Sequence, residues 1–254
     1  MKLRNKVALV IGGSSGIGKA ICIAFAKEGA KIGVVASSDV NKANAVVEQI
    51  TADGGEALAI TADVTKVDEL KTAVNAVTEA FGGLDILVNS AGVHYVTPMG
   101  ETDPADIDRM IDVNLRGTLQ AINVAVPALK DRGGGKIISL SSNLGFMGWA
   151  RQATYCATKA AIANMTKALA RELAPHGINV NAIAPGLTAT PMNEALRTQP
   201  EFKEMLDHVR ARTPGRLYSF PEDIAGLAVF LASADGIAMP GATVIMDEGG
   251  STGI

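Results

Sequence analysis

The chain has 254 residues, enough for one large domain or two small ones, and 48% of them are hydrophobic while only 4% are aromatic. Such an aliphatic composition is typical of buried parallel strands covered by helices on both faces. The net charge of −3 and the lack of a basic run exclude electrostatic attraction to nucleic acid or to an anionic membrane, so we expect a small-molecule partner.

The two cysteines, Cys22 and Cys156, lie in predicted helices and offer no disulfide framework, which favours a reducing compartment. The apolar segment after Lys6 is about seven residues long, too short for a signal segment or a membrane span. The three histidines are scattered without ligand spacing, so we expect no metal site. These features together predict a cytoplasmic protein.

Seven short apolar runs predict strands, at Val7–Ile11, Ile32–Ala36, Ala57–Ala62, Ile86–Val88, Lys136–Ser141, Val180–Ala184 and Thr243–Met246. Helical patterns separate them. The first places Ile17, Ile21 and Phe25 on one face before Gly29 ends it. We predict that the helix after the third strand opens at Thr65 in an acidic capping box with Asp68, and that Asp103 and Pro104 cap and begin a later one.

Strands that alternate with helices predict one parallel sheet with right-handed crossovers. Since no change in composition divides the chain, we expect a single doubly wound, Rossmann-type α/β domain over residues 1–254. Ligands of such sheets bind beyond the carboxyl ends of the strands. The irregular segment Gly186–Tyr218 is interpreted as a mobile substrate flap, covering about 187–218.

A glycine-rich turn joins the first strand to the first helix, with Gly12, Gly16 and Gly18 as its glycines. Without a Cβ at these positions, backbone N–H groups at a helix N-terminus can approach a pyrophosphate closely. The turn could be only a tight connection, but its position after a strand and before a helix favours dinucleotide binding.

Tyr155 and Lys159 are four residues apart, so on a helix they share one face. An ammonium beside a phenol favours the phenolate, so we predict that Lys159 lowers the pKa of Tyr155 from its ordinary value of about 10. That would suit a general acid/base near neutral pH. The alternative, a surface tyrosine with a lysine lying along it, is disfavoured because Ser142 ends a buried strand thirteen residues earlier.

Several motifs, in this order and spacing, resemble the short-chain dehydrogenase/reductase family over nearly the whole chain. They are the glycine turn, Asp63-Val64, Asn89-Ser90-Ala91-Gly92, Asn114, Ser142, Tyr155 to Lys159, and Pro185-Gly186. Ile11, Ser90 and Thr188 depart mildly from the family pattern, and none of them removes a reacting group.

The resemblance implies an NAD(P)(H)-dependent oxidoreductase that moves a hydride between nicotinamide and a ketone or secondary alcohol. Tyr155 would be the general acid/base, and Ser142 would orient the substrate oxygen. Lys159 would bind the nicotinamide ribose, and Asn114 would hold a water that links Lys159 to a proton relay. Strand alternation separates Ser142 from Ser139 and Ser141.

The resemblance also implies a coenzyme site in which Asp63 accepts from the adenine amine, although Asp63 could instead be a helix cap. The implied coenzyme-binding residues are Gly12, Ser14, Ser15, Gly16, Ile17, Gly18, Ser37, Ser38, Asp63, Val64, Asn89, Ala91, Gly92, Tyr155, Lys159, Pro185, Gly186, Thr188 and Thr190.

The end of the second strand indicates which coenzyme is bound. NAD-specific sites place a carboxylate there, about twenty residues beyond the glycines, to bind the ribose 2′-OH. This chain instead has Ser37 and Ser38, which could donate to a 2′-phosphate, and Asp39 lies further on as a solvated turn residue. We therefore favour NADP(H) over NAD(H); an inward-turned Asp39 would reverse that preference.

The substrate pocket is predicted to be moderately apolar, with candidate residues at His94, Tyr95, Phe146, Met147, Trp149 and the flap from Met192 to Leu206. The aromatic members could equally be packing residues. The overall pattern resembles 3-oxoacyl carrier-protein reductases and ketone or sugar-alcohol reductases, with Lys130, Arg132 and Arg171 as candidate carrier-protein contacts.

Two classes of alternative function and the oligomeric state are left open by the sequence. A catalytically silent coenzyme-binding regulator is disfavoured by the intact motif residues, and an epimerase or enoyl reductase by chain length and by the Tyr-Lys spacing. The resemblance further implies a homodimer or homotetramer, formed through the helices of Asn114 and Tyr155 and through Ala238–Ile254.

Overall fold

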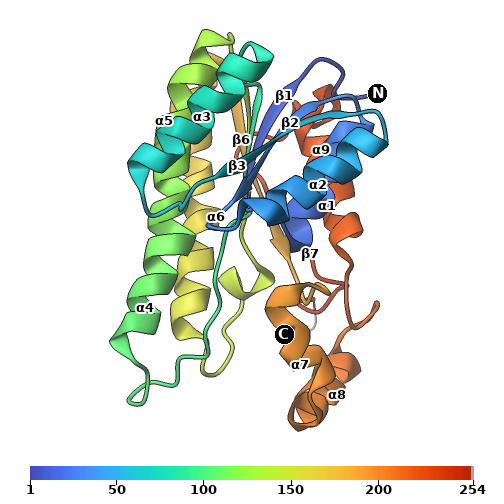
Figure 1. The fold of residues 1–254 in the computed structure, drawn as a ribbon. Helices are drawn as coiled ribbons and strands as arrows, with labels where there is room; N and C mark the ends of the chain where they lie inside the picture. Colours follow the sequence, from blue (N-terminus) through green and yellow to red (C-terminus); the bar gives the residue numbers. More distant parts are fainter. Residues whose placement is uncertain (253–254) are drawn as a thin grey trace.

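The computed structural model describes residues 1–252 as alternating strands and helices (Figure 1). The strands are β1 (Val7–Ile11), β2 (Lys31–Ala36), β3 (Glu56–Thr61), β4 (Ile86–Asn89), β5 (Gly135–Leu140), β6 (Ile178–Pro185) and β7 (Thr243–Met246). The α-helices are α1 (Gly16–Lys27), α2 (Val40–Ala52), α3 (Val67–Phe81), α4 (Pro104–Met110), α5 (Gly117–Asp131), α6 (Ala153–Leu173), α7 (Glu194–Thr198), α8 (Lys203–Arg212) and α9 (Pro221–Ala232). Every predicted strand is present, and no end is displaced by more than two residues.

All seven strands are parallel and form one sheet in the order β3-β2-β1-β4-β5-β6-β7, so the doubly wound fold is confirmed. The order reverses at β1, which pairs with β2 on one side and with β4 on the other. A crevice therefore opens between the carboxyl ends of β1 and β4, where ligands of such sheets bind.

Helices cover both faces of the sheet, as expected from its apolar strands. Along β1, Ala8 and Val10 pack under α1, α2 and α9, whereas Val7, Leu9 and Ile11 pack under α3, α5 and α6. All five residues are buried, because each face of a central parallel strand lies against a helical layer. Figure 1 shows α3, α5 and α6 on one side of the sheet, and α1 and α9 on the other.

Two of the predicted helix starts have different outcomes. At α4 the prediction is confirmed, since the Asp103 carboxylate accepts from the backbone N of Ala105 at 2.9 Å and Pro104 is the first helical residue. At α3 the capping box is wrong, because the helix begins two residues later, at Val67. The Thr65 hydroxyl is occupied locally, donating to the Asp63 carboxylate at 2.8 Å.

The amino end of the sheet is held by Asp85, which is only 5% exposed. Its carboxylate accepts from the backbone N of Val7 at 3.0 Å, and Lys6 and Arg132 pair with it at 3.2 and 3.3 Å. Arg132 is thus engaged at the amino end of the strands, opposite to the carboxyl end where the site is expected. Its assignment as a carrier-protein contact near the pocket is therefore wrong.

The segment between β6 and α9 is more regular than the sequence indicated, because it contains α7 and α8. Its two ends meet: Thr188 bridges Ser219, and the backbone N of Ser219 donates to Leu187 at 3.0 Å. In Figure 1 the two helices project beyond the carboxyl end of the sheet. Within residues 1–252, no helix is both long and apolar enough to span a membrane. The last two residues of the predicted contact segment Ala238–Ile254 lie outside the described part.

Candidate active site

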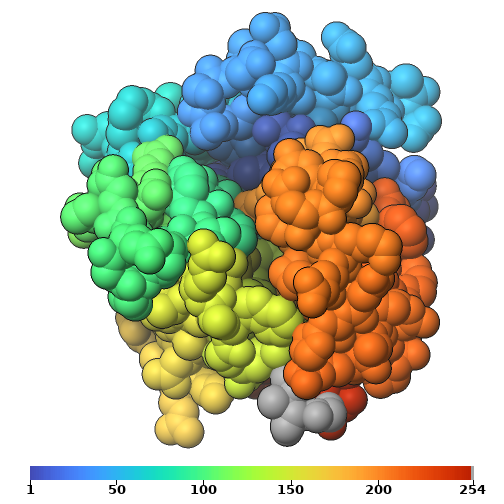
Figure 2. All heavy atoms as spheres, turned by 90° about the horizontal axis from the view of Figure 1, so that it is seen from below, coloured from blue at the N-terminus to red at the C-terminus, as the bar shows by residue number. Residues whose placement is uncertain are grey.

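A cavity of about 1390 Å³ lies at the carboxyl ends of the central strands. Its walls come from the loops after β1, β4, β5 and β6 and from the segment that carries α7 and α8. Figure 2 shows the molecule hollowed on this face, between the green-to-yellow segments and the orange helices. This volume exceeds that of a typical pocket for one small ligand, roughly 300–1,000 Å³, so a dinucleotide and a substrate can share it.

The glycine-rich turn forms one end of the cavity through Gly12, Ser14, Ser15, Gly16 and Ile17. Gly12 and Gly16 have positive φ angles of 77° and 51°, which side chains rarely adopt. A Cβ on Gly12 would lie 2.6 Å from the backbone N of Ala91. The turn can therefore lie this close to the loop after β4 only with glycine at this position.

The N-terminus of α1 is open to an anion. Ser15 occupies the N-cap position, but its side chain accepts no hydrogen bond from the first turn, which also contains no acidic residue. Free N–H groups and the helix dipole there favour a phosphate. The residues present therefore fit the pyrophosphate of a dinucleotide.

The predicted coenzyme residues divide into two groups. Ser37, Asp63, Val64, Ala91, Gly92, Pro185, Gly186, Thr188 and Thr190 line the cavity with the turn, whereas Gly18, Ser38 and Asn89 are not part of its lining. A Cβ on Gly18 would overlap the carbonyl oxygen of Gly12, and Asn89 donates to the Ser139 hydroxyl at 3.2 Å. Gly18 and Asn89 therefore hold the turn and the neighbouring strands together in this structure.

Asp63 lines the cavity, but its carboxylate is already engaged. It accepts from both the backbone N and the hydroxyl of Thr65, at 2.9 and 2.8 Å. Burial raises the pKa of this carboxyl, but the two hydrogen bonds from Thr65, together with the nearby charges of Arg109 and Lys66, outweigh burial, and the net pKa is lowered. The sequence left open that Asp63 is a local cap. In this structure its carboxylate caps the turn at Thr65, and the residue also lines the cavity.

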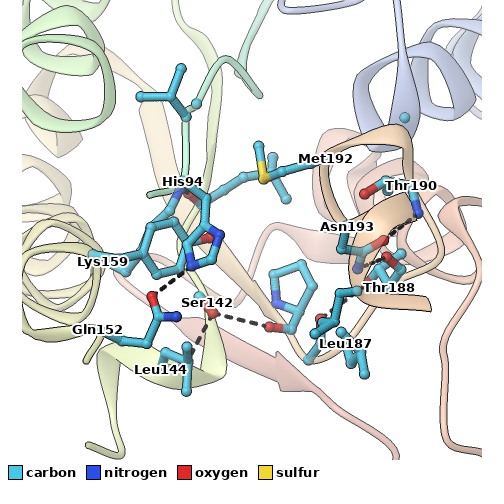
Figure 3. A pocket seen from close by; sticks show the side chains of 18 of the residues that line it. His94, Ser142, Leu144, Gln152, Lys159, Leu187, Thr188, Thr190, Met192 and Asn193 are labelled. Carbon is cyan, nitrogen blue, oxygen red and sulfur yellow. Dashed lines mark hydrogen bonds between the residues drawn. The ribbon is translucent and has the colours of Figure 1, made fainter. Parts of the chain in front are cut away.

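Ser142, Tyr155 and Lys159 all line the cavity, where the end of β5 meets α6. The Ser142 hydroxyl lies 3.5 Å from the Pro185 carbonyl and accepts from the backbone N of Leu144 at 3.2 Å (Figure 3). The Lys159 ammonium donates to the Leu140 carbonyl at 2.8 Å and lies 5.5 Å from the centre of the Tyr155 ring. The structure thus brings the three predicted reacting groups together.

The prediction that Lys159 lowers the pKa of Tyr155 is wrong in this structure. Burial raises the pKa of the phenol to about 12, against a smaller lowering by the Ser142 hydroxyl. Burial also lowers the pKa of Lys159, to about 8. Both shifts have one cause, since a poorly solvated site disfavours the charged form of either group. Helical spacing alone could not give this result, because it carries no information on solvation.

Asn114 is fully buried and is held in a π-helical turn, Ile111–Arg116, between α4 and α5. Its amide accepts from the backbone N of Val93 at 2.8 Å and donates to the Val93 carbonyl at 2.9 Å. The side chain therefore fixes the loop after β4 and does not itself line the cavity. A Cβ on Gly92 would lie 3.3 Å from the Asn114 amide oxygen and 3.8 Å from the Lys159 nitrogen, so both side chains approach the loop at Gly92.

The substrate end of the cavity is only partly as predicted. His94, Met147, Trp149 and residues of the 192–206 segment line it, but Tyr95 and Phe146 do not, and Phe146 is 48% exposed. Asn193, within the predicted 192–206 segment, is part of this lining, and so is Gln152, which the sequence did not single out. Asn193 is bonded within its own segment, and Gln152 lies one helical turn before Tyr155, a position that could have indicated it.

Comparison with known proteins agrees with this geometry. Residues 6–201 match the family model described as short chain dehydrogenase. The chain is 39% identical over 245 residues to the 3-oxoacyl-[acyl-carrier-protein] reductase FabG of Staphylococcus epidermidis, covering 96% of this chain and 98% of that protein. It is 38% identical to the galactitol 2-dehydrogenase of Agrobacterium fabrum, with 98% of each chain covered.

The fold is also that of solved relatives. A short chain dehydrogenase from Burkholderia cenocepacia, crystallised in complex with NADP, superposes with a TM-score of 0.91 at 37% identity, covering 98% of this chain and 99% of that one. The chain therefore belongs to the short-chain dehydrogenase family, and it is an oxidoreductase that transfers hydride between a nicotinamide dinucleotide and the carbon of a ketone or secondary alcohol.

Proposed function

We propose that this enzyme uses NADP(H) and that Tyr155 exchanges the proton with the substrate oxygen. The observation that carries the proposal is the meeting of Ser142, Tyr155 and Lys159 on one wall of a cavity whose other end is the glycine-rich turn. When bound, the coenzyme supplies or accepts the hydride. The turn, Ser37, the loop after β4 and the Pro185–Thr190 segment would hold it.

In the direction of reduction, the Tyr155 phenol carries the proton to be transferred. With its pKa raised to about 12 by burial, the phenol is protonated at neutral pH and can donate to a carbonyl oxygen. The Ser142 hydroxyl would bind the same oxygen and orient it. The Lys159 ammonium, 5.5 Å from the ring centre, would bind the nicotinamide ribose beside the reacting groups.

Proton resupply would run past Asn114. Its contact with Val93 holds the loop after β4, and its amide lies near Lys159 across Gly92. We propose that a water in this gap links Lys159 to solvent, with Asn114 as the positioning residue. The π-helical turn supports this role, because such turns shift backbone carbonyls out of regular helical pairing and are frequent at functional sites.

Replacing Tyr155 with Phe tests the acid/base role, since it keeps the ring and removes the proton. We expect kcat with a panel of ketones to fall about 10³-fold, within the usual range for general acid/base residues, while coenzyme binding measured by nicotinamide fluorescence changes little. Tyr95→Phe is the matched control, because Tyr95 lies on the nearby loop outside the cavity lining. A Tyr155→Phe enzyme that oxidises its coenzyme as fast as the parent would refute the proposal; coenzyme binding without turnover by the parent would indicate a regulatory protein.

The preference for NADP(H) rests on the end of β2. Ser37 lines the cavity there, while the Asp39 carboxylate accepts from the backbone N of Asn41 at 3.0 Å as the cap of α2. Among the described residues, no carboxylate from this loop lines the cavity, so none opposes a 2′-phosphate. The NADP bound to the Burkholderia relative points the same way.

Ser37→Asp is expected to reverse this preference. A carboxylate at this position would repel a 2′-phosphate, so the Kd for NADPH should rise at least about tenfold while that for NADH does not. Ser38→Asp serves as the control, since it adds the same charge at a position outside the cavity lining. Equal effects of the two variants on NADPH binding would contradict the assignment.

We further propose that residues 187–218 close over the substrate and that the protein assembles as a homodimer or homotetramer. The paired ends of the segment, at Leu187 and Ser219, are suited to a hinge. Ile111 and Leu119 are exposed near α4 and α5, and Ile237 and Ile245 are exposed near the C-terminal strand, which supports two contact faces. Light scattering that gives a monomer mass would refute the assembly.

A further inference from the structure

Two polar side chains, His94 and Gln152, form a hydrogen-bonded pair beside Tyr155 in the cavity. The imidazole of His94 packs edge-on against the Tyr155 ring, with the ring centres 4.7 Å apart and an interplanar angle of 82°. The Nε2 atom of His94 lies 2.6 Å from the Oε1 atom of Gln152 (Figure 3). Both side chains line the cavity. Neither has a part in the proton transfer proposed above.

The backbone holds this pair in place. One residue before Gln152, Arg151 has a φ of 64°, which is unusual for a residue other than glycine. In this conformation its carbonyl accepts from the backbone N of Thr97 at 2.8 Å. The loop that carries His94 is therefore joined to the loop that carries Gln152 twice, once through backbone and once through side chains. Strained backbone maintained beside a cavity is frequent at ligand sites.

The pair presents a hydrogen-bond acceptor to the cavity. With the Gln152 carbonyl oxygen facing the ring, Nε2 of His94 must be the donor, so in the neutral imidazole Nδ1 keeps its lone pair. Within residues 1–252, Nδ1 has no hydrogen-bond partner. The nearby lining is largely apolar, including Met147 and Met192, so this acceptor stands out.

We infer that His94, oriented by Gln152, is a specificity-determining residue that binds a hydroxyl group next to the reacting carbonyl, so that the preferred substrates are α-hydroxyketones and the corresponding vicinal diols. The proposal rests on the proposed function, because it takes the first substrate oxygen to lie at Tyr155. Because the two rings are in contact, one small substrate can reach both, and a substrate with oxygens on adjacent carbons suits this short span. The substrate hydroxyl donates and Nδ1 accepts.

Paired ketones that differ only in this hydroxyl provide the test. Reduction would be measured for acetoin against 2-butanone, hydroxyacetone against acetone, and 2-hydroxycyclohexanone against cyclohexanone. The parent is expected to prefer the hydroxylated member of each pair in kcat/KM. In His94→Phe, which keeps an aromatic ring against Tyr155, we expect that ratio to fall about tenfold, with the loss carried by the hydroxylated member of each pair.

Two further variants separate recognition from simple bracing of the loops. Gln152→Leu should lower the same ratio by a smaller factor, because the imidazole is then unoriented but present. Met147→Leu changes another lining residue without a hydrogen bond and should leave the ratio unchanged. If His94→Phe lowered both members of each pair equally, or if the parent preferred the deoxy ketones, the inference would be overturned while the proposed function stood. Absence of turnover of the whole panel by the parent, with either coenzyme, would overturn both.

Discussion

Lys159→Met is expected to make the coenzyme-free protein more stable while it removes a residue of the active site. Lys159 is 5% exposed, and burial lowers its pKa from 10.5 to about 8. A change of this size corresponds to about 3 kcal/mol that the folded state loses by holding the ammonium. Methionine fills a similar volume without charge but gives up the charged hydrogen bond to the buried Leu140 carbonyl, worth about 2 kcal/mol. The expected net gain in the free energy of unfolding at pH 7 is therefore about 1 kcal/mol.

This gain must depend on pH. Between about pH 8 and 10.5 the folded parent binds fewer protons at Lys159 than the unfolded chain does, so the stability of the parent rises with pH across that window. The variant has no such contribution, and its advantage should shrink towards pH 10.5. Tyr155, with its pKa raised to about 12, makes stability fall above about pH 10, but it does so in both proteins and cancels in their difference.

Urea unfolding at pH 7, 9 and 10 without coenzyme measures these differences directly. Lys167→Met is the matched control, because Lys167 lies on the same helix α6 and is exposed. It should show neither the gain nor the pH dependence. A Lys159→Met protein that is less stable than the parent at pH 7, or whose difference from the parent is the same at all three pH values, would refute the argument from burial.

Two structural substitutions have equally specific outcomes. Gly18→Ala would bring a Cβ onto the carbonyl oxygen of Gly12. We expect the free energy of unfolding, measured in urea, to fall by about 3 kcal/mol and coenzyme binding to weaken. Gly226→Ala is the control: its Cβ would lie in open space on α9, and the free energy of unfolding should rise by about 1 kcal/mol. Asn114→Leu leaves the backbone N–H and carbonyl of Val93 unpaired, so it should cost about 2 to 4 kcal/mol and raise amide hydrogen exchange at Val93. Unchanged exchange there would show that Asn114 does not hold the loop.

Much of this architecture follows from the sequence, because strand and helix patterns are local. The apolar runs predicted all seven strands, and their alternation with helices predicted a parallel sheet. The glycine turn was recognisable for the same reason, since the φ of 77° at Gly12 is a local backbone conformation that favours glycine. Where the prediction failed, at the start of α3, two local hydrogen-bonding patterns competed for Thr65 and the bond to Asp63 was formed.

By itself, then, the sequence determined which residues would reach the carboxyl edge of the sheet, because chain order and strand direction bring Ser142 and Tyr155 to that edge. Only the tertiary structure decided how well each group there is solvated, and hence that burial raises the pKa of the phenol and lowers that of Lys159. It also decided that His94 meets Gln152, 58 residues further along the chain. Solvation and long-range contact depend on how the layers pack against one another, which no local pattern of residues records.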